Sequence, residues 1–103
     1  MPEKFYITAS LPYTNAPSHI GHLLEFIQTD VLARYNRLLG KDVFFLTGTD
    51  EHGRKNVKAA EKEGKSPQDF VNAISESVRN LISKSGISID AFVRTTDKNL
   101  HWP

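Results

Sequence analysis

The fold is decided by residues 5–47, which read FYITASLPYTNAPSHIGHLLEFIQTDVLARYNRLLGKDVFFLT. The stretch begins with Phe5-Tyr6-Ile7-Thr8-Ala9, whose aromatic and β-branched residues are typical of a short strand. Pro12 and Pro17, with small polar residues around them, exclude regular structure over residues 10–18. A strand followed by a loop is therefore expected.

A helix is predicted next, because apolar residues recur every three or four positions and form one stripe on a helical face. These residues are Ile20, Leu24, Ile27, Val31, Tyr35 and Leu38. Ser18 is the predicted N-cap, and Gly40 is predicted to end the helix. Residues 43–47 are apolar without alternation, as expected for a strand covered on both faces in a parallel sheet. The order strand, helix, strand predicts a right-handed crossover.

The rest of the chain continues this alternation. Residues 48–63 begin as a loop and are expected to become helical, with Gly64 as the stop. Another helix is predicted to begin at the N-cap Ser66 and to end at Gly86. Its apolar stripe comprises Phe70, Ile74, Val78, Leu81 and Ile82. Residues 91–93 are a candidate third strand. The sequence thus predicts the α/β class: a parallel sheet with flanking helices.

Composition restricts the function further. With 103 residues, 39% hydrophobic and 24% charged, the chain has the size and composition of one globular domain. Thirteen basic against twelve acidic residues exclude the strongly basic field of a non-specific DNA-binding protein. The absence of cysteine excludes disulfides and thiolate metal sites and suits a reducing cytoplasm. Since no apolar run is long enough for a signal peptide or a membrane span, we expect a cytoplasmic location.

Candidate functional residues gather in two loops. In an open α/β sheet, ligands bind outside the carboxyl ends of the strands. The loop after the first strand carries Leu11, Tyr13 and Asn15, and the loop after the second carries residues 49–53. The first long helix also begins at this end, and a helix N-terminus is a ready site for phosphate. We therefore expect the two loops to lie side by side on one rim.

His19 and His22 are three residues apart at the start of the helix, so their side chains project from one face. Gly21 between them would let a flat ring or a phosphate approach the backbone. The same spacing fits a pair of metal ligands, although no third ligand accompanies it and the helix dipole there repels a cation. Two surface histidines without a function are the remaining interpretation. Spacing alone leaves these alternatives open.

Two segments resemble a known family. Residues 12–22, which end in His-Ile-Gly-His, resemble the first signature of class I aminoacyl-tRNA synthetases. Residues 43–53, which end in Thr-Asp-Glu-His-Gly, resemble the segment that follows in methionyl-tRNA synthetases. Two matched segments in the right order are far more specific than one short motif. The resemblance covers essentially the whole chain and implies the first half of a Rossmann-like nucleotide-binding domain, residues 1–103.

The resemblance also implies roles at individual positions. His19 and His22 would be catalytic, since they would bind the ATP phosphates and stabilise charge that develops at the α-phosphorus. Gly21 would lie against the adenine. Pro12, Asn15 and Glu25 are further ATP-side candidates. Leu11 and Tyr13 would line a methionine pocket, and the Asp50 carboxylate would pair with the ammonium group of the substrate. Glu51 and His52 receive only a supporting role.

Each of these residues has a simpler structural interpretation. Leu11 would pack in the core, Tyr13 would cover the end of the sheet, and Asp50 would be the N-cap of the next helix. Residues 83–85 echo the end of the family's second, lysine-rich signature, but they close an amphipathic helix and are interpreted as a helix end. The basic residues are interpreted as a solvated helix face rather than an RNA contact. They are Arg54, Lys55, Lys58, Lys62 and Lys65.

As a whole, the resemblance implies a methionine–tRNA ligase that uses L-methionine, ATP with Mg²⁺, and tRNA(Met). The chain would lack the second half of the catalytic domain, any zinc-binding insertion, which is where a Zn²⁺ site would lie, and the anticodon-binding domain. We therefore expect the isolated chain to be inactive. Two alternatives remain: a non-catalytic nucleotide-binding module or split subunit, and a class I synthetase for another amino acid. The interpretation depends on the loops around Tyr13 and Asp50 sharing one cleft with the histidines.

Overall fold

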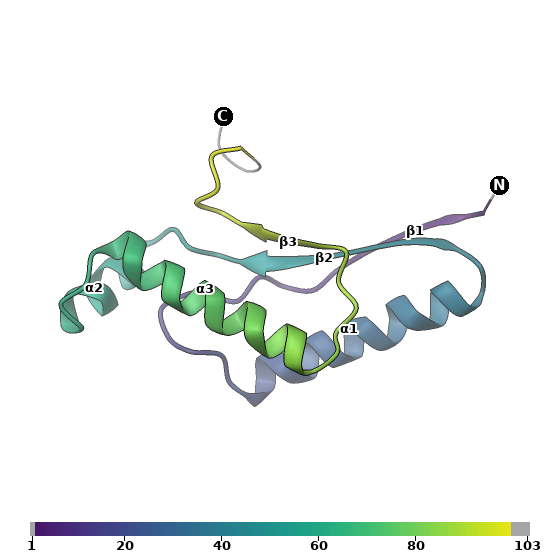
Figure 1. Ribbon diagram of the computed structural model, residues 1–103, viewed down its shortest axis with the longest axis horizontal. Coiled ribbons are helices and arrows are strands. Elements are labelled where there is room, and N and C mark those ends of the chain that lie inside the picture. Colours follow the sequence, from purple (N-terminus) through teal and green to yellow (C-terminus); the bar gives the residue numbers. More distant parts are fainter. Residues whose placement is uncertain (1, 100–103) are drawn as a thin grey trace.

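The computed structural model describes residues 2–99 and contains one parallel sheet with helices packed on it (Figure 1). The strands are β1 (Lys4–Thr8), β2 (Asp42–Thr49) and β3 (Ala91–Arg94), and the helices are α1 (Ile20–Leu38), α2 (Arg54–Lys62) and α3 (Pro67–Lys84). The sheet order is β1-β2-β3, and both pairs of neighbours are parallel. The predicted α/β class and all six predicted elements are therefore confirmed. None of the helices within residues 2–99 is long and apolar enough to cross a membrane.

Within residues 2–99, the helices cover one face of the sheet. Phe45 points into the core, where it is fully buried against residues from α1 and α3, and both helices lie on the same side of the strands (Figure 1). Phe44, on the opposite face, is 45% exposed and stacks on Tyr6 with 5.9 Å between the ring centroids. The prediction that residues 43–47 are covered on both faces is thus wrong for the described chain. Strands added in one direction by right-handed crossovers place both helices on the same face.

The apolar stripe of α1 faces away from the sheet. The residues that α1 buries are Phe26, Thr29, Asp30, Ala33 and Asn36. The six apolar residues of the predicted stripe are all exposed, and Leu38 reaches 87%. The periodicity correctly predicts the helix and a single apolar face. The helix nevertheless packs on the sheet through small and polar residues beside Phe26, which leaves an unusually apolar surface without a cover in the described chain.

The start of α1 differs from the prediction in one position. His19, not Ser18, is the N-cap: its backbone is extended (φ −120°, ψ 178°), and its side chain accepts a hydrogen bond from the Gly21 amide. An imidazole nitrogen here takes the place of the usual hydroxyl or carboxylate oxygen. The other predicted cap is confirmed, because the Ser66 hydroxyl accepts a hydrogen bond from the Asp69 amide. Gly40, with φ 81°, follows α1 as predicted.

A polar cluster fastens α1 to the segment before β3. The Asp30 carboxylate accepts hydrogen bonds from Arg34 Nε at 2.8 Å and from the backbone amide of Ser88 at 2.9 Å. The Ser88 hydroxyl also donates to it. Burial favours the protonated acid, but the donors from Ser88 and Arg34 outweigh it and hold the pKa of Asp30 below its usual value. This cluster joins two elements that are distant in sequence.

Candidate functional site

The loops after β1 and β2 meet at the carboxyl end of the sheet. Tyr13 and Asp50 form a parallel bridge. The Asp50 amide donates to the Pro12 carbonyl at 2.9 Å, and the Thr14 amide donates to the Asp50 carbonyl at 3.1 Å. These contacts continue the pairing of β1 with β2 beyond the strands. The predicted juxtaposition of the Tyr13 and Asp50 loops is confirmed.

Tyr13 lies against the start of α2. A Cβ atom added to Gly53 would overlap the Tyr13 hydroxyl, so only glycine leaves room for this ring. Gly53 also has φ 140°, a conformation that other residues rarely adopt. Tyr13 is therefore fixed beside the loop that carries Asp50 and Glu51. This position agrees with both interpretations of Tyr13, as part of a substrate pocket and as a cover for the end of the sheet. Leu11 is partly buried in the same loop, and no contact distinguishes its two interpretations.

Asp50 presents a carboxylate to the rim. The N-cap of α2 is Gly53, so the interpretation of Asp50 as that N-cap is wrong. The residue is exposed, and within residues 2–99 its carboxylate takes part in no hydrogen bond or ion pair with another side chain. Its backbone is held on both sides while its charge stays available. This arrangement suits the binding of a cationic group from outside the chain.

The two histidines form one stacked unit at the N-terminus of α1. Their ring centroids are 3.9 Å apart, with 16° between the ring planes. Nδ1 of His19 accepts from the Gly21 amide at 3.0 Å, and Nδ1 of His22 accepts from the His19 amide at 3.2 Å. Since both Nδ1 atoms accept, each neutral ring carries its hydrogen on Nε2. The pair therefore offers two N–H donors at the positive end of a helix, which is chemistry suited to an anion.

Gly21 is required by this cap. A Cβ atom at this position would lie 2.8 Å from Cε1 of His19. Gly21 therefore makes room for the capping ring of His19, a role separate from the ligand approach that the sequence predicts.

The pKa of His22 lies below its usual value. Burial is the largest cause and the positive charge of His19 is the second, while Glu25 acts in the opposite direction. The neutral, hydrogen-bond-donating form of His22 therefore extends to lower pH.

Three further predicted residues occupy different positions. Glu25 Oε1 accepts from the Ser10 amide at 2.9 Å and so ties the loop after β1 to α1. Pro12 is buried and supplies the carbonyl bonded to Asp50. Asn15 lines a cleft of about 490 Å³ between its loop, α2 and α3. Lys55, Lys58 and Lys62 line the same cleft, so part of the basic helix face borders a concave surface.

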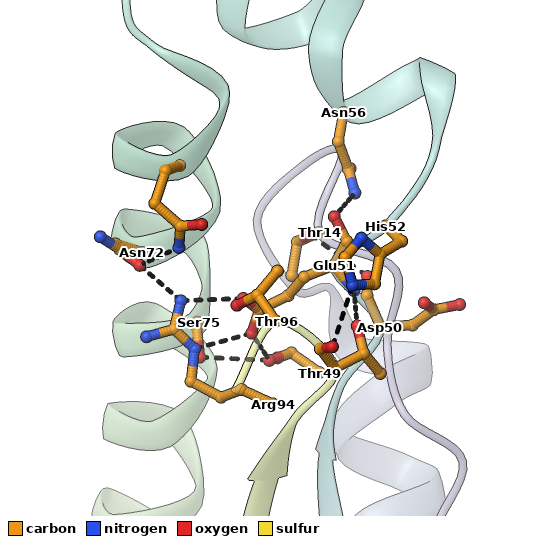
Figure 2. Close-up of polar contacts among 12 residues, drawn as sticks. Thr14, Thr49, Asp50, Glu51, His52, Asn56, Asn72, Ser75, Arg94 and Thr96 are labelled. Carbon is orange, nitrogen blue, oxygen red and sulfur yellow. Dashed lines mark hydrogen bonds and ion pairs between the residues drawn. The ribbon is translucent and has the colours of Figure 1, made fainter. Parts of the chain in front are cut away.

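Glu51 forms the most connected side-chain network of the described chain. Its side chain is 0% exposed and pairs with Arg94 through two contacts, Nε–Oε2 at 2.7 Å and Nη2–Oε1 at 2.8 Å (Figure 2). The hydroxyls of Thr49 and Thr96 donate to the same carboxylate. Burial favours its protonated form, but the hydrogen bonds from Arg94, Thr49 and Thr96 prevail and hold the pKa of Glu51 below its usual range.

Sequence reasoning missed the partners of Glu51. Arg94 is the last residue of β3 and Thr96 follows it, more than 40 positions along the chain from Glu51. His52 also contacts this segment, with Nε2 at 2.9 Å from the Thr95 carbonyl. Only the parallel pairing of β2 with β3 brings these residues together, and no local pattern in the sequence predicts it. Residues 83–85, by contrast, end α3 as predicted, with Lys84 as its last residue.

The histidine pair lacks the companions that a metal site needs. Over residues 2–99, no group of three or more His, Cys, Asp or Glu side chains is placed to hold a metal ion. The described residues therefore do not fit a zinc site of three or four ligands.

The parallel sheet, with a histidine-capped helix start and the loop of Asp50 and Glu51 after its strands, has the architecture of a Rossmann-like α/β domain of the nucleotide-binding class. A family model described as "tRNA synthetases class I (M)" matches residues 5–102. The chain belongs to this family.

Individual relatives agree with this assignment. The chain is 48% identical over 95 residues to a methionine–tRNA ligase of Thermotoga maritima, covering 92% of this chain and 15% of that protein. It is 52% identical over 94 residues to the methionine–tRNA ligase of Deinococcus radiodurans, covering 90% and 14%. Among solved structures, Mycobacterium tuberculosis methionyl-tRNA synthetase in complex with methionyl-adenylate superimposes with a TM-score of 0.92 at 41% identity. That match covers 94% of this chain and 19% of the solved one. The chain therefore spans less than a fifth of the length of these relatives.

Proposed function

We propose that residues 1–103 are the first half of the nucleotide-binding catalytic domain of a methionyl-tRNA synthetase. The complete enzyme activates L-methionine with ATP and transfers it to tRNA(Met) during protein synthesis in the cytoplasm. The observation that carries the proposal is the Tyr13–Asp50 bridge, because it unites the two segments that resemble this family in one rim. The names of the relatives, methionine–tRNA ligases, support methionine as the amino acid.

The histidine pair would bind the ATP phosphates. Their Nε2–H groups are the donors left over once both Nδ1 atoms cap α1. A helix N-terminus adds positive potential at the same place. These donors would stabilise negative charge that develops at the α-phosphorus, and the loss of one such preorganised donor typically costs about 10²–10³ in rate. Gly21 would lie against the adenine, and Pro12, Asn15 and Glu25 would shape the nucleotide side of the site.

The Asp50 carboxylate would pair with the ammonium group of methionine. It is the carboxylate on this rim with no cationic partner among the described residues, and charge-assisted contacts are about twice as strong as neutral ones. Tyr13 and Leu11 would contact the substrate side chain. This arrangement selects an α-amino acid by its charged group and a thioether side chain by apolar contact.

The reaction needs positioning more than covalent chemistry. The methionine carboxylate would attack the α-phosphorus of ATP in line, and pyrophosphate would leave. A hydroxyl of the terminal ribose of the tRNA would then attack the carbonyl carbon of the adenylate, and AMP would leave. Mg²⁺ enters as part of the ATP substrate. The described residues supply no zinc site, so any Zn²⁺ of a complete enzyme would be held elsewhere.

A split subunit or binding module is the second candidate. The uncovered apolar face of α1 and the exposed Tyr6–Phe44 pair favour a partner segment, on the same or another polypeptide, that completes the domain. In either case the 103-residue chain alone would show little or no aminoacylation.

A chimaera tests the proposed function. This chain replaces the matching segment of the Thermotoga maritima relative, and methionine-dependent ATP–pyrophosphate exchange is measured, with the unaltered relative as the control. We expect exchange by the chimaera, a raised KM for methionine in Asp50→Asn, and a lowered kcat in His22→Ala. Preferential activation of another amino acid, or exchange that neither substitution affects, would overturn the proposal. Robust exchange by the 103-residue chain alone would contradict the expectation of inactivity.

A further inference from the structure

The backbone around Asp50 is fixed on both sides of its Cα atom. The peptide that precedes Asp50 is held because its N–H donates to the Pro12 carbonyl at 2.9 Å. The peptide that follows is held at both ends: its carbonyl accepts from the Thr14 amide at 3.1 Å, and its N–H, which belongs to Glu51, donates to the Thr95 hydroxyl at 2.8 Å. With both peptide planes set, the Cα–Cβ direction of Asp50 is set as well. Only its side-chain torsions remain free.

The peptide that follows Asp50 is held in place through the contacts of Glu51. Its carboxylate accepts two contacts from Arg94 and one each from the hydroxyls of Thr49 and Thr96 (Figure 2). Its carbonyl accepts from Asn56 Nδ2 at 2.7 Å, which ties the same residue to α2. Glu51 is therefore anchored through its side chain and through both backbone groups.

The same contacts separate the roles of two adjacent acids. Arg94 compensates the charge of Glu51 in a site closed to solvent, since the Glu51 side chain is 0% exposed. Asp50 has no such partner among the described residues and is exposed. A compensated carboxylate has little attraction left for an external cation, whereas an uncompensated one on a fixed backbone is preorganised to bind it.

We propose that Glu51, with Arg94 as its counter-charge, is the positioning residue that fixes the backbone of Asp50 and so sets the direction in which the Asp50 side chain extends towards the ammonium group of an amino-acid substrate. Glu51 does not touch the substrate and acts through the peptide that it shares with Asp50. The identity of the ligand rests on the proposed function, while the fixing of Asp50 rests on the contacts of the chain itself. Loss of Glu51 would thus weaken recognition of the amine more than recognition of the rest of the ligand.

The experiment has two readouts on the 103-residue chain. The first is amide hydrogen exchange at Asp50 and Thr14, relative to the core amides of α3. The second is the affinity for a sulfamate analogue of methionyl-adenylate compared with the same molecule lacking the α-amino group. The variants are Glu51→Gln, which keeps the shape and removes the charge, and Arg94→Lys, which keeps a charge but not the two-pronged contact. Asp30→Asn is the matched control, because Asp30 is also held by an arginine and a hydroxyl, that of Ser88, but lies away from the rim.

In Glu51→Gln we expect exchange at Asp50 and Thr14 to rise about tenfold relative to α3, and the preference for the amine to fall by about the same factor. Arg94→Lys should change both readouts in the same direction by less, and Asp30→Asn should change neither. Unchanged exchange at Asp50 and Thr14 in both rim variants would overturn the positioning role, whatever happens to binding. A third outcome is faster exchange in the rim variants while the unaltered chain shows no preference for the ligand with the amine. This outcome would support the fixing of Asp50 by Glu51 and would overturn the proposed function instead. An equal loss for both ligands would show a purely structural role and would also overturn the proposal.

Discussion

Two buried acids, Asp30 in α1 and Glu51 after β2, are held by the same kinds of groups and differ in what they border. Asp30 is bonded to Arg34 and Ser88, and Glu51 is bonded to Arg94, Thr49 and Thr96. The Asp30 cluster fastens α1 to the segment before β3, and all its contacts stay within the scaffold. The Glu51 network adjoins an acid that has no cationic partner in the described chain. Similar polar chemistry therefore fastens the fold at Asp30 and, at Glu51, lies beside an acid whose charge is left without a cation in the described chain.

Burial is the second difference between them. The Arg34 side chain is 56% exposed, whereas the Arg94 side chain is 29% exposed and faces a carboxylate closed to solvent. Exposed ion pairs contribute about 0–1 kcal/mol, but removing one partner of a buried pair leaves an uncompensated charge. The two clusters should therefore respond differently to the same substitution.

The largest effect is expected for Arg94→Ala, which leaves the Glu51 carboxylate buried without its cation. The free energy of unfolding, measured by urea denaturation, should fall by about 3–5 kcal/mol. Arg34→Ala is the matched substitution and should cost about 1 kcal/mol or less, since Asp30 keeps its bonds to Ser88. Equal losses in the two variants would contradict the distinction between the clusters.

Acid should weaken both clusters. The pKa values of Glu51 and Asp30 are lowered in the folded chain, so the unfolded state binds more protons as the pH falls. Their contribution to stability is complete above the pKa values of the unfolded chain and is lost as the pH falls through the lowered values, from about pH 5 downward.

Urea midpoints measured between neutral and acidic pH check the acid dependence. Glu51→Gln and Asp30→Asn should each flatten the slope, because each removes one of the groups that titrate. A slope that neither substitution changes would assign the acid sensitivity to other carboxyls.

The smallest effect concerns the rim itself. The pKa of His22 is lowered by burial and by His19 and raised by Glu25, so Glu25→Gln should lower it further. Because the folded chain disfavours the protonated ring, the neutral form contributes stability above the unfolded pKa, and this contribution is lost as the pH falls through the folded one. An NMR titration of the imidazole Cε1–H signals measures the pKa of His22 in the unaltered chain and in Glu25→Gln. An unchanged or raised pKa of His22 in Glu25→Gln would contradict the electrostatic contact of Glu25 with the ring.

Local patterns predict the elements of this fold well. Strand composition, helical periodicity and the cap at Ser66 depend on neighbouring residues, and each is confirmed. Periodicity gives α1 one apolar face but does not say what that face contacts, which is why the exposure of Leu38 and its neighbours is not predictable. Whether one or both faces of β2 are covered depends on where the crossovers place their helices. This placement is a property of the assembled sheet and cannot be read from the strand itself.

The candidate site shows the same division. The loops around Tyr13 and Asp50 are brought together as predicted, because parallel strands end at a common edge. The cap at His19 is missed because serine is the commoner choice and stands one position earlier. The pairing of Glu51 with Arg94 is missed because it joins residues 43 positions apart through β3.

The central claim is that the loops after β1 and β2 form one rim that binds an aminoacyl-adenylate. NMR titration of the isotope-labelled 103-residue chain with the sulfamate analogue of methionyl-adenylate tests it most directly. Shifted backbone signals should gather in residues 11–22 and 49–53, and Asp50→Asn should weaken the response. Signals that shift only around the lysine-lined cleft of α2, or that shift equally with and without the Asp50 carboxylate, would contradict it.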